Sequence, residues 1–279
     1  HYVCLYDTRQ RQYIQDLDRH TDWVRSTVFS PDGSQLATAG NDRTVCVWDC
    51  NDWTRPAWFN RQPEAIFHVS FTKDGLKLAT VGFDRWLRIY DAETGEQLTK
   101  LRCPCSDIHA VAFSADDQLI AAGGRCGNIR VWNMVTADEL SEFEAHRQRI
   151  RSIEFTSDNL ILSAGDDQIV RITDPMQSLT SQSLPRHAAK LYATTLMDGD
   201  LVATAGSDNL IHIWQLNNLK KLGSLRGHTG TVTSLVYSGH QLVSGSYDTH
   251  VRIWSTEQHT SATHQRHTDL TNGWNQKLK

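Results

Sequence analysis

A repeat with a period of about 40 residues is the feature that most restricts how this chain can fold. The best-preserved copy runs from Arg19 to Asp49, RHTDWVRSTVFSPDGSQLATAGNDRTVCVWD. When the copies are aligned on the end of their third apolar run, seven residues separated by 42, 42, 42, 41, 41 and 40 positions fall in one column: Tyr6, Trp48, Tyr90, Trp132, Thr173, Trp214 and Trp254. A fixed period of this length predicts stacked structural units, each of which packs only on its neighbours.

Each copy predicts a sheet of four short antiparallel strands. In the copy at 19–49, apolar or β-branched runs occupy Trp23–Phe29, Gln35–Ala39 and Thr44–Trp48. The clusters Pro31-Asp32-Gly33 and Gly40-Asn41-Asp42 between them form turns. A fourth run follows the Trp column in other copies: Gln97–Leu101, Glu139–Phe143 and Lys220–Leu225. Four strands per period, with His before the first and Trp-Asp after the third, is the pattern of a propeller blade.

These columns resemble those of the WD-repeat (WD40) family of β-propellers over essentially the whole chain. In that family a His before the first strand, a hydroxyl in the second, an Asp in the following turn and the Trp form a hydrogen-bonded chain inside the blade. The chemistry suits this role, because each group is costly to bury without a partner. The resemblance implies three complete networks: His20, Thr38, Asp42 and Trp48; His187, Thr204, Asp208 and Trp214; and His228, Ser244, Asp248 and Trp254.

The other three copies depart from this pattern. Gln62 and Tyr90 replace the His and the Trp of the second copy, and Thr173 replaces the Trp of the fourth. The third copy has Pro104, Ala122 and Cys126 where His, hydroxyl and Asp are expected. We expect packing alone to hold these three blades.

The repeats predict an all-β fold in a single domain over residues 1–279, a seven-bladed propeller of four-stranded antiparallel blades. Residues 1–18 supply the outer strands of the closing blade, 19–265 form six complete repeats, and 266–279 begin the closing blade, because Arg266-His267-Thr268-Asp269 repeats residues 19–22. Sharing one blade between the two termini closes a ring and hides its edges. The second strand of that blade is in neither segment, so we expect a longer chain or a complex; a six-bladed ring with loose ends is the alternative.

Composition excludes several classes of protein. No apolar run approaches the length of a membrane span and no signal peptide is evident, which favours the cytoplasm or the nucleus. The net charge of −4 argues against a globally basic nucleic-acid binder. We expect the six cysteines to be reduced thiols. Cys103, Cys105 and Cys126 converge in the third blade, either as a soft replacement for the lost network or as a metal or redox cluster.

The sequence predicts no catalytic residue, no bound metal and no cofactor. It contains no G-x-S-x-G, no H-E-x-x-H and no P-loop. The Asp and His columns recur in register with the blade, which favours a structural role over acid–base chemistry.

Function is predicted to lie where the copies differ. The parity of apolar residues changes within the first strand, which indicates a bulge that turns two side chains per blade towards the mouth of the central channel. With the turns after the second strands, these positions form a rim rich in Arg and aromatic residues: Trp23, Arg25, Phe67, Phe83, His109, Arg125, Arg149, Arg151, Lys190, Tyr192 and Tyr247. Such a composition is typical of interface hot spots. We predict a non-catalytic platform for protein partners, with an acidic or phosphorylated segment bound on the top face; a nucleic-acid reader using the same rim is the alternative.

Overall fold

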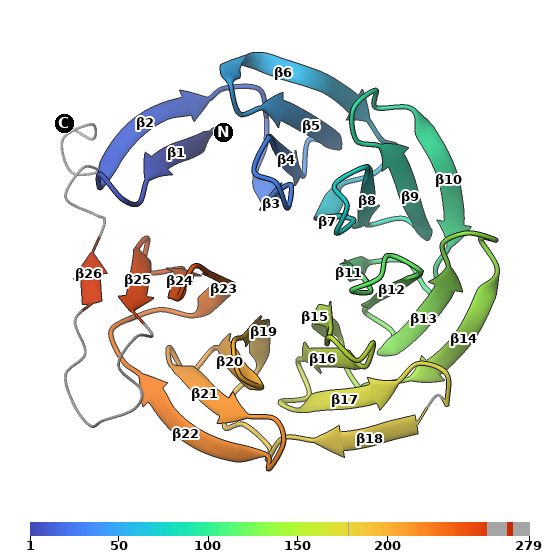
Figure 1. Cartoon of the computed structure of the whole chain (residues 1–279), viewed down its shortest axis with the longest axis vertical. Coiled ribbons are helices and arrows are strands. Elements are labelled where there is room, and N and C mark those ends of the chain that lie inside the picture. Colours follow the sequence, from blue (N-terminus) through green and yellow to red (C-terminus); the bar gives the residue numbers. More distant parts are fainter. Residues whose placement is uncertain (178, 256–266, 270–279) are drawn as a thin grey trace.

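In a computed structural model that describes residues 1–177, 179–255 and 267–269, short antiparallel strands form sheets arranged in a ring (Figure 1). Six of the sheets have four strands and one has two. Blade 1 contains β3 (Val24–Phe29), β4 (Gln35–Gly40), β5 (Thr44–Asp49) and β6 (Asp52–Arg61), and blade 2 contains β7 (Ile66–Phe71), β8 (Lys77–Gly82), β9 (Trp86–Asp91) and β10 (Gln97–Arg102).

The next four blades follow the same order, with the first strand nearest the axis of the ring and the fourth outermost (Figure 1). Blade 3 contains β11 (Ile108–Phe113), β12 (Leu119–Gly124), β13 (Asn128–Asn133) and β14 (Glu139–Glu144), and blade 4 contains β15 (Ile150–Phe155), β16 (Ile161–Gly165), β17 (Val170–Asp174) and β18 (Leu179–Ser183). Blade 5 contains β19 (Leu191–Met197), β20 (Leu201–Gly206), β21 (Ile211–Gln215) and β22 (Lys220–Leu225), and blade 6 contains β23 (Val232–Ser238), β24 (Gln241–Ser246), β25 (Val251–Ser255) and β26 (His267–Asp269). The predicted all-β propeller of four-stranded antiparallel blades is therefore confirmed.

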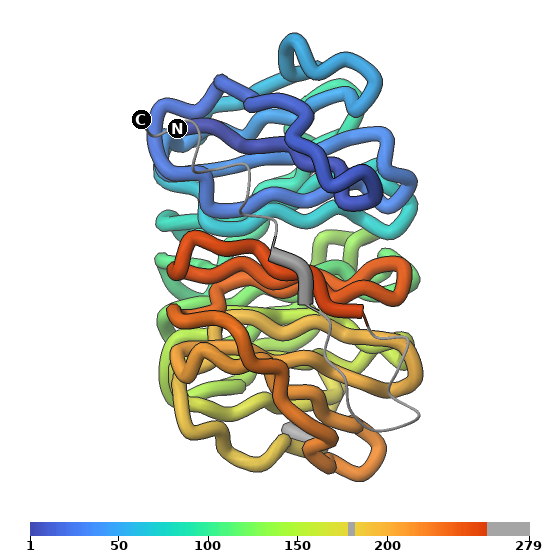
Figure 2. Tube along the Cα trace, turned by 90° about the vertical axis from the view of Figure 1, so that its left-hand side faces the viewer, coloured from blue at the N-terminus to red at the C-terminus, as the bar shows by residue number. Residues whose placement is uncertain are grey.

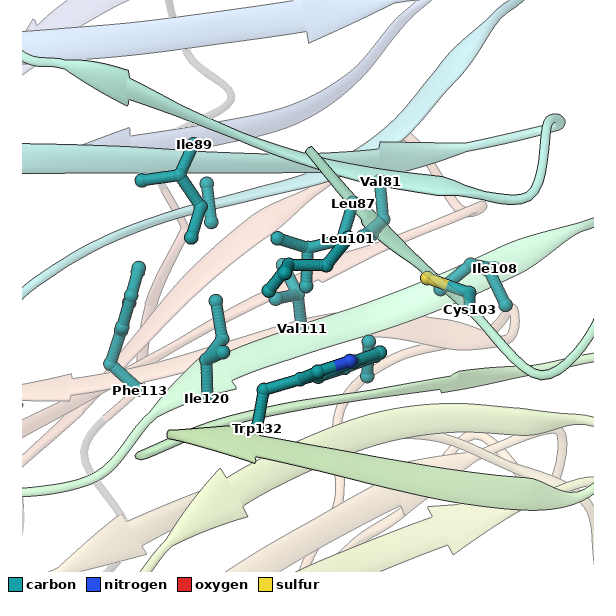
Figure 3. Packing of buried hydrophobic residues seen from close by; sticks show 12 residues of the cluster. Val81, Leu87, Ile89, Leu101, Cys103, Ile108, Val111, Phe113, Ile120 and Trp132 are labelled. Carbon is teal, nitrogen blue, oxygen red and sulfur yellow. The ribbon is translucent and has the colours of Figure 1, made fainter. Parts of the chain in front are cut away.

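The hydrophobic core lies between neighbouring blades rather than inside one sheet. Figure 3 shows the joint of blades 2 and 3, where Val81 and Leu87 from blade 2 lie near Val111 from blade 3, and Ile89 from blade 2 lies near Phe113 from blade 3. Val111 and Phe113 are the third and fifth residues after Ile108, and this spacing puts them on the sheet face turned towards the preceding blade. Every joint of this kind buries β-branched and aromatic side chains, so each blade depends on its neighbours for stability.

The predicted bulge is present near the start of the first strand in all six blades. The pairing register shifts between Val24 and Ser26, and at the equivalent position in each later blade. The bulge brings a carbonyl oxygen so close to the end of the second strand that a Cβ atom there would lie 1.8–2.4 Å from it in five blades. Those five positions are all glycine: Gly40, Gly82, Gly124, Gly165 and Gly206.

The sector between blades 6 and 1 differs from the others. It holds the two-stranded sheet of β1 (Val3–Asp7) and β2 (Gln12–Leu17), which continues the ring at the radius of the outer strands (Figure 1). Viewed from this side in Figure 2, the dark-blue β1–β2 hairpin lies above the red strands of blade 6. The placement of residues 1–18 as an outer pair agrees with this arrangement, while the described residues form six complete blades rather than seven.

The assignment of the C-terminal segment requires a correction. The sequence places residues 267–269 in the closing blade, whereas β26 pairs with β25 and forms the outer strand of blade 6. Strand pairing uses backbone groups that every residue carries, so the likeness of residues 266–269 to 19–22 did not decide the partner. Residues 256–265, which the sequence assigns to the end of the sixth repeat, lie outside the described residues, as do 266 and 270–279.

Candidate partner-binding surface at the top rim

The top rim is the end of the ring where the first strands begin and where the turns between second and third strands lie. One backbone hydrogen bond per blade joins these two segments, as in Asn41 N–H to Trp23 C=O (2.9 Å) and Arg125 N–H to Asp107 C=O (3.0 Å). The same bond occurs at Phe83, Asp166, Ser207 and Tyr247. All the predicted rim residues are therefore brought to one end of the propeller.

Blades 1 and 6 contain the complete buried network beneath this rim. In blade 1, Trp48 Nε1–H donates to Thr38 Oγ1 (3.1 Å), which lies 2.9 Å from His20 Nε2, and His20 Nδ1 lies 2.9 Å from the Asp42 carboxylate. In blade 6 the same three links join Trp254, Ser244, His228 and Asp248. Thr21 N–H also donates to Asp42, so the carboxylate ties the loop before the first strand to the turn after the second.

Blade 5 contains a different arrangement from the one that the resemblance implies. Trp214 Nε1–H donates to Thr204 Oγ1 (3.1 Å), but Asp208 bonds His212 Nε2 (2.8 Å) instead of His187. The Nε2 atom of His187 is buried without a hydrogen-bond partner among the described residues, and its ring packs edge-on against Trp214 at 5.0 Å. Burial, reinforced by the neighbouring His212, lowers the pKa of His187 to about 4. His212, on the third strand, therefore replaces His187 as the partner of the Asp208 carboxylate.

Arg88 and Arg171 occupy the position of His212 in blades 2 and 4 and join polar networks there, where packing alone was expected. Gln62 donates to Thr80 Oγ1 (2.7 Å) and to Tyr90 (3.1 Å), and it accepts from Arg88, which pairs with Asp84. In blade 4, His146 lies 2.8 Å from Asp167 and 2.9 Å from Ser163, and Arg171 donates to Asp167 (2.7 Å). Burial alone would raise the pKa of Asp167, but the hydrogen bonds from His146 and Arg171 hold it below its usual range. The expectation for these two blades was wrong.

Blade 3 has a covalent link instead of the network. Cys105 and Cys126 form a disulfide, with Cα atoms 6.2 Å apart. The expectation of reduced thiols is therefore wrong for this pair: the alignment brought the two residues into one region, and the structure places their Cα atoms at a separation that satisfies disulfide geometry. Cys103 remains a free, buried thiol. Among the described residues, no group of three or more metal-ligating side chains converges on one point.

The bulge residues form an arc of contacting rings and cations around the channel mouth. The Arg25 guanidinium lies 5.3 Å from the centre of the Trp23 ring and 5.9 Å from that of Phe67. Phe67 stacks face to face on His109 at 4.5 Å, and the Phe83 ring lies 5.9 Å from Phe67. These contacts join blades 1, 2 and 3 at the rim.

The exposed part of this arc is aromatic. Trp23 is 60% exposed and Phe83 is 53% exposed, and Tyr247 of blade 6 is 72% exposed. Rings that are exposed to this degree and supported from below by other side chains have the character of anchors for a partner. The structure therefore brings Trp23, Phe67 and Phe83 together around Arg25, while Tyr247 lies on another blade.

The sequence places Arg125, Arg149, Arg151 and Lys190 on three consecutive blades, and two of these four cations pair with carboxylates. Arg149 pairs with Asp107 (3.2 Å), and Arg151 pairs with Asp166 through two contacts (2.9 and 3.3 Å) while lying 4.9 Å from the Tyr192 ring. Arg149 and Arg151 are therefore not free cations, because each has a carboxylate within ion-pair distance. Arg125 and Lys190 are exposed and have no ion pair among the described residues.

Asp107 also lies at the rim, although it is not among the predicted binding residues. It is buried, has a positive φ of 66°, and places its carboxylate 2.8 Å from His109 Nε2 as well as beside Arg149. Burial outweighs this carboxylate and lowers the pKa of His109 to about 4, so the stacked ring is neutral at pH 7. The equivalent positions in the other copies hold Trp, Ala, Arg, Lys and Thr, so an Asp at this position was the sequence signal that could have identified the residue.

Comparison with known proteins identifies the class of protein. The family described as WD domain, G-beta repeat matches residues 11–49, 95–133, 137–174 and 219–255, which is more than half of the chain. The chain belongs to this family, as the sequence columns predicted. Among the described residues, no helix has the length and apolar character needed to cross a membrane.

Individual relatives are similar over short stretches. The chain is 39% identical over 59 residues to eukaryotic translation initiation factor 3 subunit I of Eremothecium gossypii, 20% of this chain and 17% of that protein. It is 37% identical over 65 residues to the U3 snoRNP-associated protein-like EMB2271 of Arabidopsis thaliana, 23% of this chain and 14% of the relative. It is 39% identical over 59 residues to the U4/U6 small nuclear ribonucleoprotein PRP4 of Saccharomyces cerevisiae, 20% of this chain and 13% of the relative. The matches thus span less than a fifth of each relative.

Proposed function

We propose that this propeller is a non-catalytic platform that holds a segment of a protein partner on its top rim. The observation that carries the proposal is the arc of Trp23, Arg25, Phe67, Phe83 and His109, whose rings and cation contact one another across three blades and stay partly exposed. Aromatic and Arg side chains dominate the energetics of protein interfaces. The names of the relatives, a factor subunit and two proteins of ribonucleoproteins, support membership of a larger assembly in the cytoplasm or the nucleus.

The proposed partner is an acidic or phosphorylated segment that crosses the channel mouth. Its apolar side chains would pack on Trp23 and Phe83, and its anionic groups would bind Arg125 and Lys190. We assign the anionic contacts to these two cations, because carboxylates already pair with Arg149 and Arg151. An unpaired exposed cation can form a charge-assisted hydrogen bond with a carboxylate or phosphate without first breaking an internal ion pair.

Charge reversal of Arg125→Glu together with Lys190→Glu tests the acidic contact. Two charged hydrogen bonds at about 1.5–3 kcal/mol each predict at least a roughly 100-fold weaker affinity for an acidic phosphopeptide selected on the wild-type protein. Calorimetric titration at low and high salt measures this change. The matched control, Arg55→Glu with Lys220→Glu, makes the same change in net charge on outer strands and should leave the affinity within about twofold.

A second variant separates the apolar contribution. Trp23→Ala should weaken the same complex with little change in its salt dependence, because apolar contacts are not screened by ions. If both rim variants bound the peptide with wild-type affinity, we would conclude that the binding surface lies outside the rim. Single-stranded RNA that displaces every peptide would instead favour the nucleic-acid reader, which the exposed rings could serve by stacking.

We also propose that the complete ring has seven blades, with β1 and β2 as the outer pair of the seventh. The faces of blades 6 and 1 that border this sector are apolar and unusually exposed. Val251 is 44% exposed, whereas its equivalents Val45, Leu87 and Ile129 are fully buried. Phe29 is 54% exposed on the other side, whereas the equivalent Phe71 is buried. Two inner strands between these faces would cover both.

Val251→Asp tests whether a seventh blade closes the ring. If inner strands cover this face, burying a carboxylate against them should lower the free energy of unfolding by at least about 2 kcal/mol, measured by urea denaturation. Val135→Asp, at a more exposed position in the β13–β14 turn, is the control and should change stability by less than about 0.5 kcal/mol. Equal tolerance of both changes would argue for a six-bladed ring.

A further inference from the structure

The disulfide of blade 3 lies at the top rim and takes the place of a hydrogen-bonded link. Cys105 belongs to the loop between β10 and β11, and Cys126 to the turn between β12 and β13. In blade 1 the corresponding loop and turn are joined through Asp42, which contacts both His20 Nδ1 and Thr21 N–H. Blade 3 lacks this His and Asp, so the disulfide is the side-chain tie between the two segments.

The two cysteines of the disulfide differ in their exposure to solvent. Cys126 is exposed, whereas Cys105 is half-buried and packs against the core between blades 2 and 3. A thiol reagent can therefore reach the disulfide from the Cys126 side. The neighbouring free thiol, Cys103, is 2% exposed, and burial raises its pKa to about 12. It stays protonated and does not compete in exchange.

The disulfide holds the segment from which the centre of the rim is built. Asp107, two residues after Cys105, accepts a hydrogen bond from Arg125 N–H and donates its own N–H to Phe83 C=O (3.1 Å). Its carboxylate pairs with Arg149. Arg125 directly precedes Cys126, so both ends of the link border residues of the candidate binding surface.

We propose that dithiol reductants reduce the Cys105–Cys126 disulfide by thiol–disulfide exchange, and that this disulfide controls the order of the top rim. A thiolate of the reductant attacks the sulfur of Cys126 and forms a mixed disulfide, and Cys105 leaves as a thiolate that takes up a proton. The second thiol of the reductant then displaces Cys126, so the reductant ends as a disulfide and the protein as two thiols. Without the link, only hydrogen bonds, the Asp107 ion pair and local packing hold residues 105–107 and the turn bearing Arg125.

Hydrogen exchange on the whole chain tests the structural part of this proposal. Treatment with dithiothreitol without denaturant should expose two additional alkylatable thiols by intact mass. It should also speed amide exchange in 104–107 and 124–127 by at least about tenfold. The equivalent segments of blade 6, 229–231 and 246–249, should not change. The double variant Cys105→Ser/Cys126→Ser should show the fast exchange without reductant.

A control variant at a cysteine outside the disulfide tests whether the effect is specific to the Cys105–Cys126 pair. Cys50→Ser removes a thiol outside the disulfide, so it should exchange like the wild type and respond to reductant in the same way. A disulfide that resists reduction until the chain unfolds would overturn the proposal, and so would unchanged exchange at 104–107 and 124–127 after reduction. Acceleration spread over all blades would also overturn it, because the link would then hold the fold rather than the rim.

The consequence for binding rests on the proposed function. An acidic phosphopeptide selected on the oxidised protein should bind the reduced protein at least about threefold more weakly, because the turn that bears Arg125 loses its fixed position. Equal affinity in the two states would overturn the control of binding by the disulfide. If no peptide binds either state, the proposed function fails, and the exchange experiment alone decides whether the disulfide orders the rim.

Discussion

Replacing Thr38 with valine should lower the free energy of unfolding by about 2–5 kcal/mol. The hydroxyl of Thr38 is shared by two buried partners, because it accepts from Trp48 Nε1–H and lies 2.9 Å from His20 Nε2. Valine keeps the shape of the side chain but leaves both nitrogens without a partner in the interior of the blade. Each unsatisfied buried group costs about 1–3 kcal/mol.

Blade 4 supplies a matched control for this substitution. Thr173 is buried to the same extent and stands in the Trp column, but its Oγ1 atom has no hydrogen-bond partner among the described residues. Thr173→Val should therefore be neutral or stabilising, because it removes a buried polar atom and breaks no bond. Urea denaturation of both variants measures the difference. Equal losses of stability would show that loss of the hydroxyl, rather than of its bonds, sets the cost.

A second large effect is expected in the pH dependence of stability. Glu154 on β15 spans the joint to β19, where its carboxylate accepts from Leu196 N–H (3.0 Å) and Thr194 Oγ1 (3.2 Å). Burial raises the pKa of Glu154 from 4.5 to about 7, in spite of these hydrogen bonds. The unfolded chain releases this proton at lower pH than the folded chain, so the contribution of Glu154 to stability falls as pH rises from about 4.5 to about 7.

The shift corresponds to about 3 kcal/mol, which Glu154→Gln should abolish. Buried histidines act in the opposite direction: burial lowers the pKa of His68 and of His187 to about 4, so their contribution is lost as pH falls below about 6.5. The measurement is therefore the difference in unfolding free energy between wild type and variant, determined by urea denaturation at pH 4.5 and pH 8. Wild type should lose about 3 kcal/mol relative to the variant over this range, and a constant difference would show that Glu154 titrates normally in the fold.

Much of the fold follows from local spacing, which the sequence displays directly. The 42-residue period, the alternation within each strand and the turn clusters set strand lengths and hairpins, because these depend on residues a few positions apart. The parity change after Val24 located the bulge, and with it the rim that carries Trp23 and Phe67. The sequence by itself therefore determined the class of fold and the end of the ring on which Arg and aromatic side chains gather.

The tertiary structure alone decided which polar groups pair. The repeat pattern pairs Asp208 with His187, but the structure pairs it with His212 of β21. Arg149 and Arg151 read as free cations until Asp107 and Asp166 are placed beside them. The ion pairs of Arg149 and Arg151 and the Cys105–Cys126 disulfide depend on distances between residues 15–42 positions apart, where a shift of about 1 Å changes the partner. Repeat spacing sets the strand and its register but leaves these distances open, and so the electrostatic character of the rim emerged only when the blades were assembled.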